Sequence, residues 1–420
     1  MKYKISILTI GDEICIGQVT NTNASWIASE CTKLGAYITR HVSVGDVMEE
    51  MLEEVDRLMK ISDFVIVTGG LGPTHDDITK PCLARYFGDV LVFNQDAYDN
   101  LEYFLSLRNI KMTVENKSMA YLPSKCKPLF NRNGTAPGML FENDGACSLA
   151  SLPGVPREMM SIMEDHVLPY IAKIIEDKNA EVLLFKTLQT SGIPESILAE
   201  KIGDVADFLG DGTLAFLPSY KGVRLRIGVS SQNFQLAETE LEKIENHIRD
   251  RAGSYIYGVG DDSLVSVIGH LLRDGGHTLS VAESCTGGLL GAELTKISGS
   301  SDYFKGGAIV YSNELKIKVL NVNPDTIKDF GAVSEQTARE LAENANKKYE
   351  TDYSLSITGI AGPTGGNDEK PVGTVWIGMA TPDNTITKNY HFGNDREINR
   401  ERAVGTALNM LYKELSGQAV

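Results

Sequence analysis

The N-terminal part of the chain alternates between short apolar runs and helical patterns. Residues 4–10 and 63–68 are largely apolar or β-branched, as in buried strands, and residues 37–44 have the pattern of a third strand. Between them, apolar positions recur at helical spacing through Trp26, Ile27 and Leu34 and again over residues 47–61. Strands that alternate with helices predict an α/β domain with a parallel sheet.

The rest of the chain shows two further patterns. Residues 186–190 and 223–229 alternate like strands, and helical patterns run through residues 197–202 and 234–251, so a small α+β module is expected between about residues 171 and 252. Residues 277–282 then alternate like a half-buried strand, and a helical pattern follows from Leu289 to Ile297. Ser284 therefore lies at a strand-to-helix turn of a second α/β domain.

Ser284 is a candidate nucleophile because of this position. The first N–H groups of a helix lack intrahelical partners, and glycines at 287 and 288 let a ligand approach the backbone. We expect the N–H groups near Cys285 to Gly288 to hold an oxyanion. The alternative is that Ser284 or Thr286 only caps the helix.

A serine nucleophile needs a base, and the sequence offers no Ser-His-Asp set, because no motif surrounds His270 or His277. Tyr311 and Lys316, after a short apolar strand, are the candidates. Lysine can accept a proton only when burial or a nearby positive charge lowers its pKa. The alternative makes Lys316 a solvated helix residue.

Two later segments could hold the rest of a ligand. Residues 355–363 form a strand that runs into a glycine-rich loop, which suits a phosphate or an amide carbonyl. Arg396 and Arg400 lie four residues apart on one face of a predicted helix and could grip a phosphate. They could equally pair with Asp395 and Glu397.

The N-terminal part carries a separate constellation. Asp12 and Glu13 follow the first strand, and the carboxyl ends of strands in open α/β sheets are where ligands bind. The glycine cluster of residues 69–72 follows the strand at 63–68 and offers free N–H groups to an anion, with Asp76 and Asp77 just beyond it. Carboxylates beside a phosphate site indicate a bridging divalent metal. The alternative is a tight glycine turn with an aspartate N-cap, after which Thr79 and Pro81 open a helix.

Composition agrees with several soluble domains. The 420 residues exceed what one core normally fills, and 42% of them are hydrophobic. A net charge of −16 argues against nucleic acid as the main partner. The six cysteines show no CxxC spacing, so we expect reduced thiols in a cytoplasmic protein, and we expect no signal peptide and no membrane span.

Four ordered motifs of the C-terminal part resemble the nicotinamide-nucleotide amidase domain of the CinA family. They are AESCTGG from residue 282, VYSNELK from 310, SITGIAGPTGG from 356 and EKPVGTVWIG from 369. The resemblance implies hydrolysis of nicotinamide mononucleotide (NMN) to nicotinate mononucleotide and ammonia, without a cofactor, with Ser284 as nucleophile and Tyr311 and Lys316 handling the proton. The candidate substrate-binding residues here are Thr286, Gly287, Gly288, Gly307, Asn313, Gly359, Ala361, Gly362, Arg396 and Arg400.

The N-terminal part resembles the molybdopterin-binding-like domain of CinA proteins through its glycine loop, NRNGTAPG from residue 131 and LPGVPREM from 152. This implies a metal-dependent pyrophosphatase that cleaves ADP-ribose to AMP and ribose 5-phosphate. Asn21 departs from the family pattern, which usually has aspartate there. The candidate metal ligands are Asp12, Glu13, Asp76 and Asp77, and the candidate substrate-binding residues are Gly69, Gly70, Gly72, Thr74, Asn133, Gly134, Pro137 and Gly138.

The sequence therefore predicts three domains and two activities. The domains are a three-layer molybdopterin-binding-like domain (1–170), a KH-like middle domain (171–252) and an α/β amidase domain (255–420). The middle domain lacks an evident GXXG clamp, so a spacer or dimer contact is the expected role. A homodimer is suggested by the family alone. The competing hypothesis is a ligand-binding regulatory protein linked to competence or DNA damage, with a non-catalytic N-terminal domain.

Overall fold

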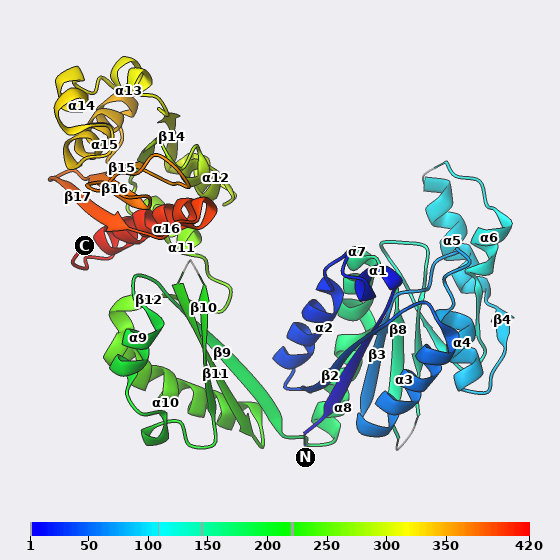
Figure 1. Cartoon of the computed structure of the whole chain (residues 1–420). Coiled ribbons are helices and arrows are strands. Elements are labelled where there is room, and N and C mark those ends of the chain that lie inside the picture. The colour runs from blue at the N-terminus through cyan, green and yellow to red at the C-terminus, as the bar shows by residue number, and fades with distance from the viewer. Residues whose placement is uncertain (1, 108, 144–145, 220–221) are drawn as a thin grey trace. The chain divides into compact units, whose positions relative to one another are not determined.

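The structure, a computed structural model, describes residues 2–107, 109–143, 146–219 and 222–420 (Figure 1). The chain divides into two compact units, one of residues 1–185 with 228–242 and one of residues 186–227 with 243–420. The elements of the expected middle module are thus shared between the two units. In the part of the chain that the structure describes, no helix is long and apolar enough to cross a membrane.

The first unit is built on a six-stranded sheet in the order β2-β1-β3-β8-β7-β6. Its strands are β1 (Lys4–Ile10), β2 (Tyr37–Val44), β3 (Phe64–Thr68), β6 (Lys127–Leu129), β7 (Gly138–Phe141) and β8 (Ser148–Leu152). The first four strands in this order are parallel, as expected. Strand β7 pairs antiparallel with β8 on one side and with β6 on the other. The expectation of a parallel sheet was therefore wrong for that edge, because β6, β7 and β8 are joined by short connections instead of helical crossovers.

Helices cover both faces of this sheet, and Figure 1 shows α2 and α3 on opposite sides of it. The helices of the unit are α1 (Asp12–Cys15), α2 (Thr22–Lys33), α3 (Met48–Ile61), α4 (Thr79–Tyr86), α5 (Gln95–Leu107), α6 (Val114–Ser118), α7 (Pro156–Ile162) and α8 (Leu168–Asp177). A two-stranded ribbon pairs β4 (Leu91–Phe93) with β5 (Tyr121–Pro123). The central strands bury almost every side chain, which is why residues 64–68 carry no polar alternation.

The middle sheet has four strands in the order β10-β11-β9-β12. They are β9 (Val182–Thr190), β10 (Thr213–Ser219), β11 (Gly222–Ser231) and β12 (Ile256–Val259), and the accompanying helices are α9 (Glu195–Ile202) and α10 (Phe234–Ala252). The hydrophobic pattern predicted β9, β11 and both helices but not β10 or β12. Only three residues separate β12 from the capping serine of the next helix, so the sheet leads directly into the C-terminal domain.

The C-terminal sheet has the order β14-β13-β15-β16-β17. Its strands are β13 (Leu279–Glu283), β14 (Phe304–Ile309), β15 (Tyr353–Gly359), β16 (Thr374–Ala380) and β17 (Thr385–His391). The strands β14, β13 and β15 are parallel, whereas β16 and β17 are antiparallel, so this sheet is also mixed.

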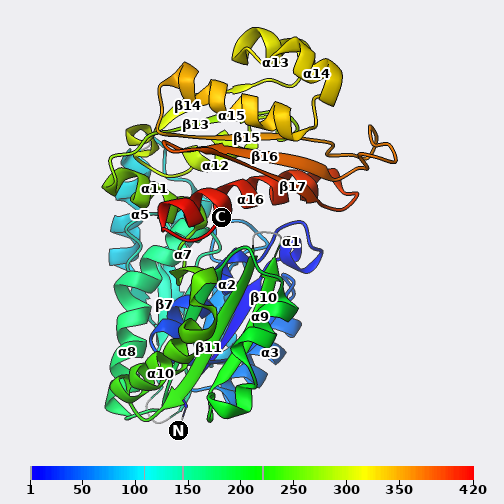
Figure 2. The same cartoon turned by 90° about the vertical axis from the view of Figure 1, so that its left-hand side faces the viewer.

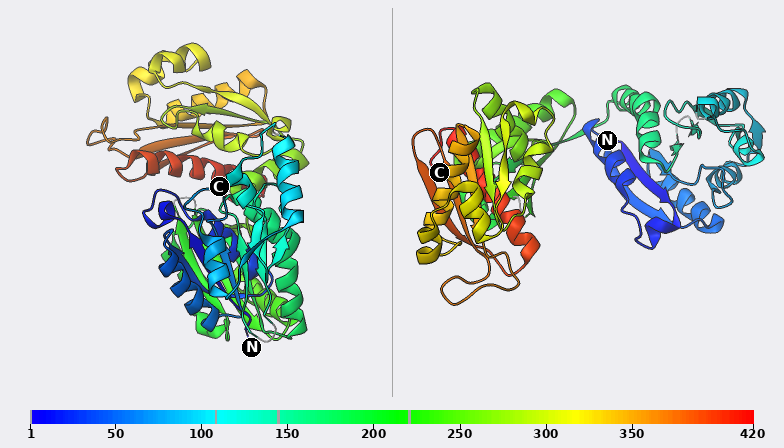
Figure 3. Two further views of the ribbon diagram at one scale, coloured as in Figure 1. Left: turned by 90° about the vertical axis from the view of Figure 1, so that its right-hand side faces the viewer. Right: turned by 90° about the horizontal axis from the view of Figure 1, so that it is seen from above.

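Two layers of helices enclose the C-terminal sheet. The helices of this domain are α11 (Leu264–Asp274), α12 (Leu289–Thr295), α13 (Asn313–Leu320), α14 (Pro324–Phe330), α15 (Glu335–Tyr349) and α16 (Arg396–Leu415). Figure 2 shows α15 on one face of the sheet and α16 on the other, and Figure 3 (left) shows the same layers from the opposite side. Because β13, β14 and β15 are parallel, their carboxyl ends meet at one edge, and the loops after them carry Ser284, Tyr311 and the glycine-rich segment.

Candidate functional site

Ser284 stands directly after β13 and is held by the neighbouring strand. Its N–H donates to the carbonyl of Ile357 in β15 at 3.0 Å, and the residue is 7% exposed. The side-chain oxygen contacts the amine of Lys316 and caps no helix, since Gly288 is the N-cap of α12. The helix-cap interpretation of Ser284 is therefore not what the geometry shows.

Lys316 is buried against Ser284. Its side-chain nitrogen Nζ lies 3.0 Å from Ser284 Oγ, 2.9 Å from the carbonyl oxygen of Val310 and 3.3 Å from that of Tyr311. The residue is 1% exposed, and burial lowers the pKa of the amine below its ordinary value. The solvated-lysine alternative is therefore wrong, because α13 begins so close to β14 that its first turn points this side chain inward.

The three contacts of Lys316 suit an amine that accepts a proton. Two of its partners are backbone carbonyls, which can only accept hydrogen bonds. A neutral amine has two hydrogens for these carbonyls and one lone pair, which is left to face the hydroxyl of Ser284. In the described part of the chain no carboxylate forms an ion pair with Lys316, so its charged form gains no compensation for burial.

Glu283 shapes the loop behind Ser284 and was missed in the sequence. Its carboxylate, 1% exposed, accepts hydrogen bonds from the N–H groups of Gly288, Leu290 and Gly291 at 3.0, 3.1 and 2.8 Å. These are donors at the start of α12, which a negative charge stabilises. An acidic residue placed just before a nucleophile and a glycine pair is the signal that could have found it.

This arrangement corrects the expected oxyanion donors. The N–H of Gly288 is taken by Glu283, and the N–H of Gly287 donates to the carbonyl of Ser284 at 3.0 Å. Among the described residues, the N–H group of Thr286 has no acceptor, and that of Cys285 has none except its own thiol. The pair available for an oxyanion is thus Cys285 and Thr286. Burial raises the pKa of the Cys285 thiol to about 11, so this neighbour is protonated at neutral pH.

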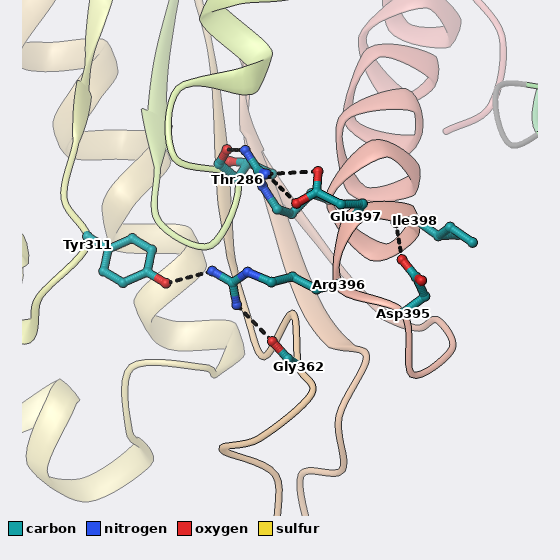
Figure 4. A network of polar contacts seen from close by, with 8 residues as sticks. Thr286, Tyr311, Gly362, Asp395, Arg396, Glu397 and Ile398 are labelled. Carbon is teal, nitrogen blue, oxygen red and sulfur yellow. Dashed lines mark hydrogen bonds and ion pairs between the residues drawn. The ribbon is translucent and has the colours of Figure 1, made fainter. Parts of the chain in front are cut away.

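Tyr311 lies at the surface side of the site. Its hydroxyl accepts a hydrogen bond from Arg396 at 3.1 Å, and the ring is 58% exposed. Arg396 also donates to the carbonyl of Gly362 at 2.8 Å, so the arginine joins the loop after β14 to the glycine-rich loop (Figure 4). Among the described residues, the Tyr311 hydroxyl forms no hydrogen bond with Ser284, whereas the Lys316 amine does.

Arg400 forms one of the ion pairs considered for it and also contacts the Ser284 loop. It donates to the Glu397 carboxylate at 3.0 Å and, through its other terminal nitrogen, to the carbonyl of Thr286 at 3.0 Å. Asp395, the other expected partner of the arginines, instead caps α16 by accepting from the N–H of Ile398 at 2.9 Å (Figure 4). Arg400 therefore borders the Ser284 loop, Arg396 borders the two neighbouring loops, and both remain candidates for a phosphate.

The other predicted residues of the C-terminal domain lie in the glycine-rich loop, in the sheet or at the start of α13. The glycine-rich loop is tied to α16 by buried Asn399, which donates to the carbonyl of Ala361 at 3.0 Å. A side chain at Gly307 would meet Val281 at 2.4 Å, and one at Gly359 would meet Val375 at 2.7 Å, so these two glycines have a packing role in the sheet. Asn313 is the first residue of α13 and is exposed.

In the N-terminal domain, Asp77 organises the glycine loop. One of its oxygens accepts from the N–H of Gly72 at 2.8 Å, and the other accepts from the N–H and the hydroxyl of Thr74 at 2.8 and 2.5 Å. The tight-turn alternative is therefore correct for Asp77, although Ile78 and not an aspartate is the N-cap of α4. The loop is also closed by Thr79, whose hydroxyl donates to the carbonyl of Gly69 at 2.9 Å.

Asp46, which the sequence analysis did not single out, belongs to the acidic cluster. Its N–H donates to Asp12 at 3.2 Å, and the N–H of Asp12 donates back to Asp46 at 3.1 Å. Burial raises the pKa of Asp46, and the charges of Asp12, Glu13 and Asp76 raise it further. The signal was its place after β2, whose carboxyl end adjoins that of β1.

These carboxylates do not form a finished metal centre. The described residues contain no group of three or more His, Cys, Asp or Glu side chains arranged to hold a metal ion. Asp77 has both oxygens engaged by the loop, and Asp76 is exposed. The metal site predicted for Asp12, Glu13, Asp76 and Asp77 thus stays a prediction.

The loop of residues 131–138 in this domain is held by Asn131, a side chain outside the predicted set. Buried Asn131 donates to the carbonyl of Ala136 at 2.8 Å and to Glu158 at 2.7 Å, which shapes the segment with Asn133, Gly134, Pro137 and Gly138. A separate pocket of about 120 Å³ is lined by Glu13, Asn21, Asn23, Gly69 and Gly154 among others. Glu13 and Gly69 are the members of the predicted set that share a pocket.

Family models match all three parts of the chain. The molybdopterin binding domain model matches residues 6–173, the KH domain model of damage-inducible protein CinA matches residues 185–258, and the CinA C-terminal domain model matches residues 261–415. A CinA-like protein of Salinibacter ruber is 42% identical over 98% of this chain and 100% of its own length.

The chain belongs to the CinA family.

Two further proteins are similar to this chain. A CinA-like protein of Kosmotoga olearia is 41% identical over 98% of this chain and 99% of its own. The crystal structure of competence damage-inducible protein A from Klebsiella pneumoniae is 34% identical over 36% of this chain and 95% of that chain, with a TM-score of 0.36.

In this CinA chain, loss of the Glu283 carboxylate should damage the loop of Ser284. We expect Glu283→Ala to lower the stability of the C-terminal domain by about 1–3 kcal/mol, because one buried and two half-buried N–H groups lose their acceptor. Calorimetric unfolding of the full chain measures this. The control is Glu314→Ala, which removes an exposed carboxylate paired with Lys318 and should change stability by less than about 0.5 kcal/mol. Equal effects of the two substitutions would contradict the capping role.

Proposed function

We propose that the C-terminal domain of this CinA chain hydrolyses the carboxamide of NMN through a Ser284–Lys316 pair. The observation that carries the proposal is the 3.0 Å contact between Lys316 Nζ and Ser284 Oγ, made by a lysine whose pKa burial lowers. A buried neutral amine beside a hydroxyl is the arrangement that activates serine without histidine.

The residues supply each step of an acyl transfer. Lys316 accepts the proton of Ser284 as Oγ attacks the carboxamide carbon, and the N–H groups of Cys285 and Thr286 are placed to donate to the oxyanion. Protonated Lys316 then gives its proton to the departing nitrogen, which leaves as ammonia. Water, deprotonated by the same amine, releases nicotinate mononucleotide from Ser284.

The NMN carboxamide is more reactive than an ordinary amide, so a single lysine base is sufficient to activate the serine. A pyridinium ring withdraws electrons from its carboxamide, so the carbonyl carbon is a better electrophile than that of an ordinary amide. Arg396 and Arg400, which border the Ser284 loop, would meet the 5′-phosphate after exchanging some of their present protein partners.

Removal of the nucleophile tests the reaction. Ser284→Ala should lower ammonia release from NMN by at least about 10³-fold, because the remaining groups can bind but cannot form the acyl intermediate. The control is Cys285→Ala, which should retain most of the rate, since its thiol is protonated. Loss of activity in Cys285→Ala with retention in Ser284→Ala would reverse the assignment. Binding of NMN without turnover by the folded wild type would favour the regulatory hypothesis.

The state of Lys316 predicts a pH dependence. Because burial lowers its pKa, the neutral, reactive form should accumulate as pH rises through a value below the ordinary lysine pKa of about 10.4. The rate parameter kcat/KM for NMN should therefore rise with pH over this limb and be lost in Lys316→Met. The control Lys318→Met alters an exposed lysine and should keep the wild-type profile. An unchanged profile in Lys316→Met would exclude the lysine as base.

For the N-terminal domain we propose hydrolysis of ADP-ribose to AMP and ribose 5-phosphate. The support is the association of the glycine loop with an acidic cluster in which Asp46 already has a raised pKa. Such a cluster repels a diphosphate unless a divalent cation offsets its charge, and Asp12, Glu13, Asp46 and Asp76 are the carboxylates that a cation could approach.

Chelation tests this second activity. EDTA should abolish AMP formation from ADP-ribose by the full chain, and added divalent metal should restore it. Asp46→Asn should lower the restored rate by at least about tenfold. The control Asp56→Asn changes an exposed carboxylate of α3 that pairs with Lys60 and should not. Hydrolysis that is indifferent to EDTA would refute the metal requirement.

A further inference from the structure

The second unit contains a cavity that none of the predicted site residues lines. It has a volume of about 480 Å³, and its walls come from β9 and β11, from the connection between β12 and α11, and from α12 and α16. This volume lies in the range of sites for small organic ligands. The floor is apolar and includes Tyr257, Leu264, Val404 and Leu408.

Gly405 indicates that the cavity is kept open. It lies in the middle of α16, where glycine weakens a helix relative to alanine. Close packing explains other glycines of this unit: a side chain at Gly378 would meet the carbonyl of Ala338 at 2.6 Å. At Gly405, in contrast, nothing lies within 4 Å of the position that a Cβ would take, and the residue lines the cavity.

Two charged residues that line the cavity, Arg224 and Glu401, have no partner in the described part of the chain. Arg224 makes no hydrogen bond or ion pair with any residue that the structure describes, and Glu401 likewise has no such partner there. Burial raises the pKa of Tyr257, with Asp262 adding to this and Arg224 opposing it, so the guanidinium lies within electrostatic reach of the phenol ring. The cavity therefore offers an aromatic and apolar surface together with Arg224 and Glu401. Its other charged lining residues are Asp261, Asp262, which accepts from the N–H of Val259, and the ion pair of Lys296 with Glu293.

We propose that this cavity binds a mononucleotide. The base would pack on Tyr257 and the apolar floor, a ribose hydroxyl would donate to Glu401, and the phosphate would pair with Arg224. Carboxylates commonly hold ribose hydroxyls in nucleotide sites, and arginine holds phosphate. Among the described charged residues that line the cavity, Arg224 is the cation that is free to meet the phosphate, since Lys296 is paired with Glu293. Binding here does not depend on the proposed amidase reaction.

The cavity also adjoins the two helices that border Ser284. The helix α12 begins at the donors capped by Glu283, and the segment at its end reaches the cavity at Ile297. In α16, Gly405 follows Arg400 by five residues, or about 7.5 Å along the axis. A bound nucleotide would contact the same two helices that carry the amidase loop and its arginines.

Binding of AMP to the full chain tests the proposal. Equilibrium dialysis should detect saturable AMP binding. In Gly405→Phe the affinity for one AMP per chain should fall at least about tenfold, because the phenyl ring fills the open space of the cavity. The matched control Gly405→Ala adds one methyl group and should bind like the wild type. AMP held at the N-terminal domain should be unaffected by either substitution.

Arg224→Glu supplies an independent variant, since it alters an exposed side chain that has no partner to lose in the described structure. It should weaken AMP binding at least about tenfold and leave adenosine binding nearly unchanged, because adenosine lacks the phosphate. Absence of saturable AMP binding by folded wild type would overturn the proposal. So would equal stoichiometry and affinity in wild type, Gly405→Phe and Arg224→Glu.

Discussion

The candidate amidase site depends on a buried lysine without a countercharge. Lys316 is 1% exposed and surrounded by two carbonyls and a hydroxyl, none of which carries a negative charge. Burial of a charged amine is costly, so the environment favours the neutral form, which is the form that can take a proton from Ser284. A neutral Lys316 thus avoids the cost of a buried charge and is also the form that the proposed reaction needs.

The sheet places the two partners of this contact. Register pairs Glu283 with Ile309 and Ile357, so the ends of β13, β14 and β15 bring Ser284 and the start of α13 together across 32 residues of sequence. Glu283 then fixes the loop from behind by capping α12. The negative charge at the start of α12 thus serves to hold the backbone, and the N–H groups next to Ser284 are the candidate donors to an oxyanion.

The N-terminal domain uses a carboxylate in the same structural way. Asp77 gathers the N–H groups of its glycine loop, as Glu283 does for α12. In both domains an acidic residue within a motif hydrogen-bonds to backbone, and of the two only Asp77 was predicted to take part in the chemistry. The acidic residues left unengaged or mutually repelling, such as Asp46, are then the better candidates for a cation.

The sequence by itself determined many of the elements, the family and a candidate nucleophile. Buried strands at residues 4–10 and 64–68 and the turn at Ser284 follow from local hydrophobic pattern, and four short motifs sufficed for the family. It did not determine the antiparallel edges of the two sheets, because pairing partners of short strands are set by contacts distant in sequence. Only the tertiary structure decided that Lys316 rather than Tyr311 reaches Ser284, that Glu283 takes the helix donors, and that a cavity lies beside Gly405. Those outcomes depend on burial and on distances between segments, which a pattern of residue types along one chain does not specify.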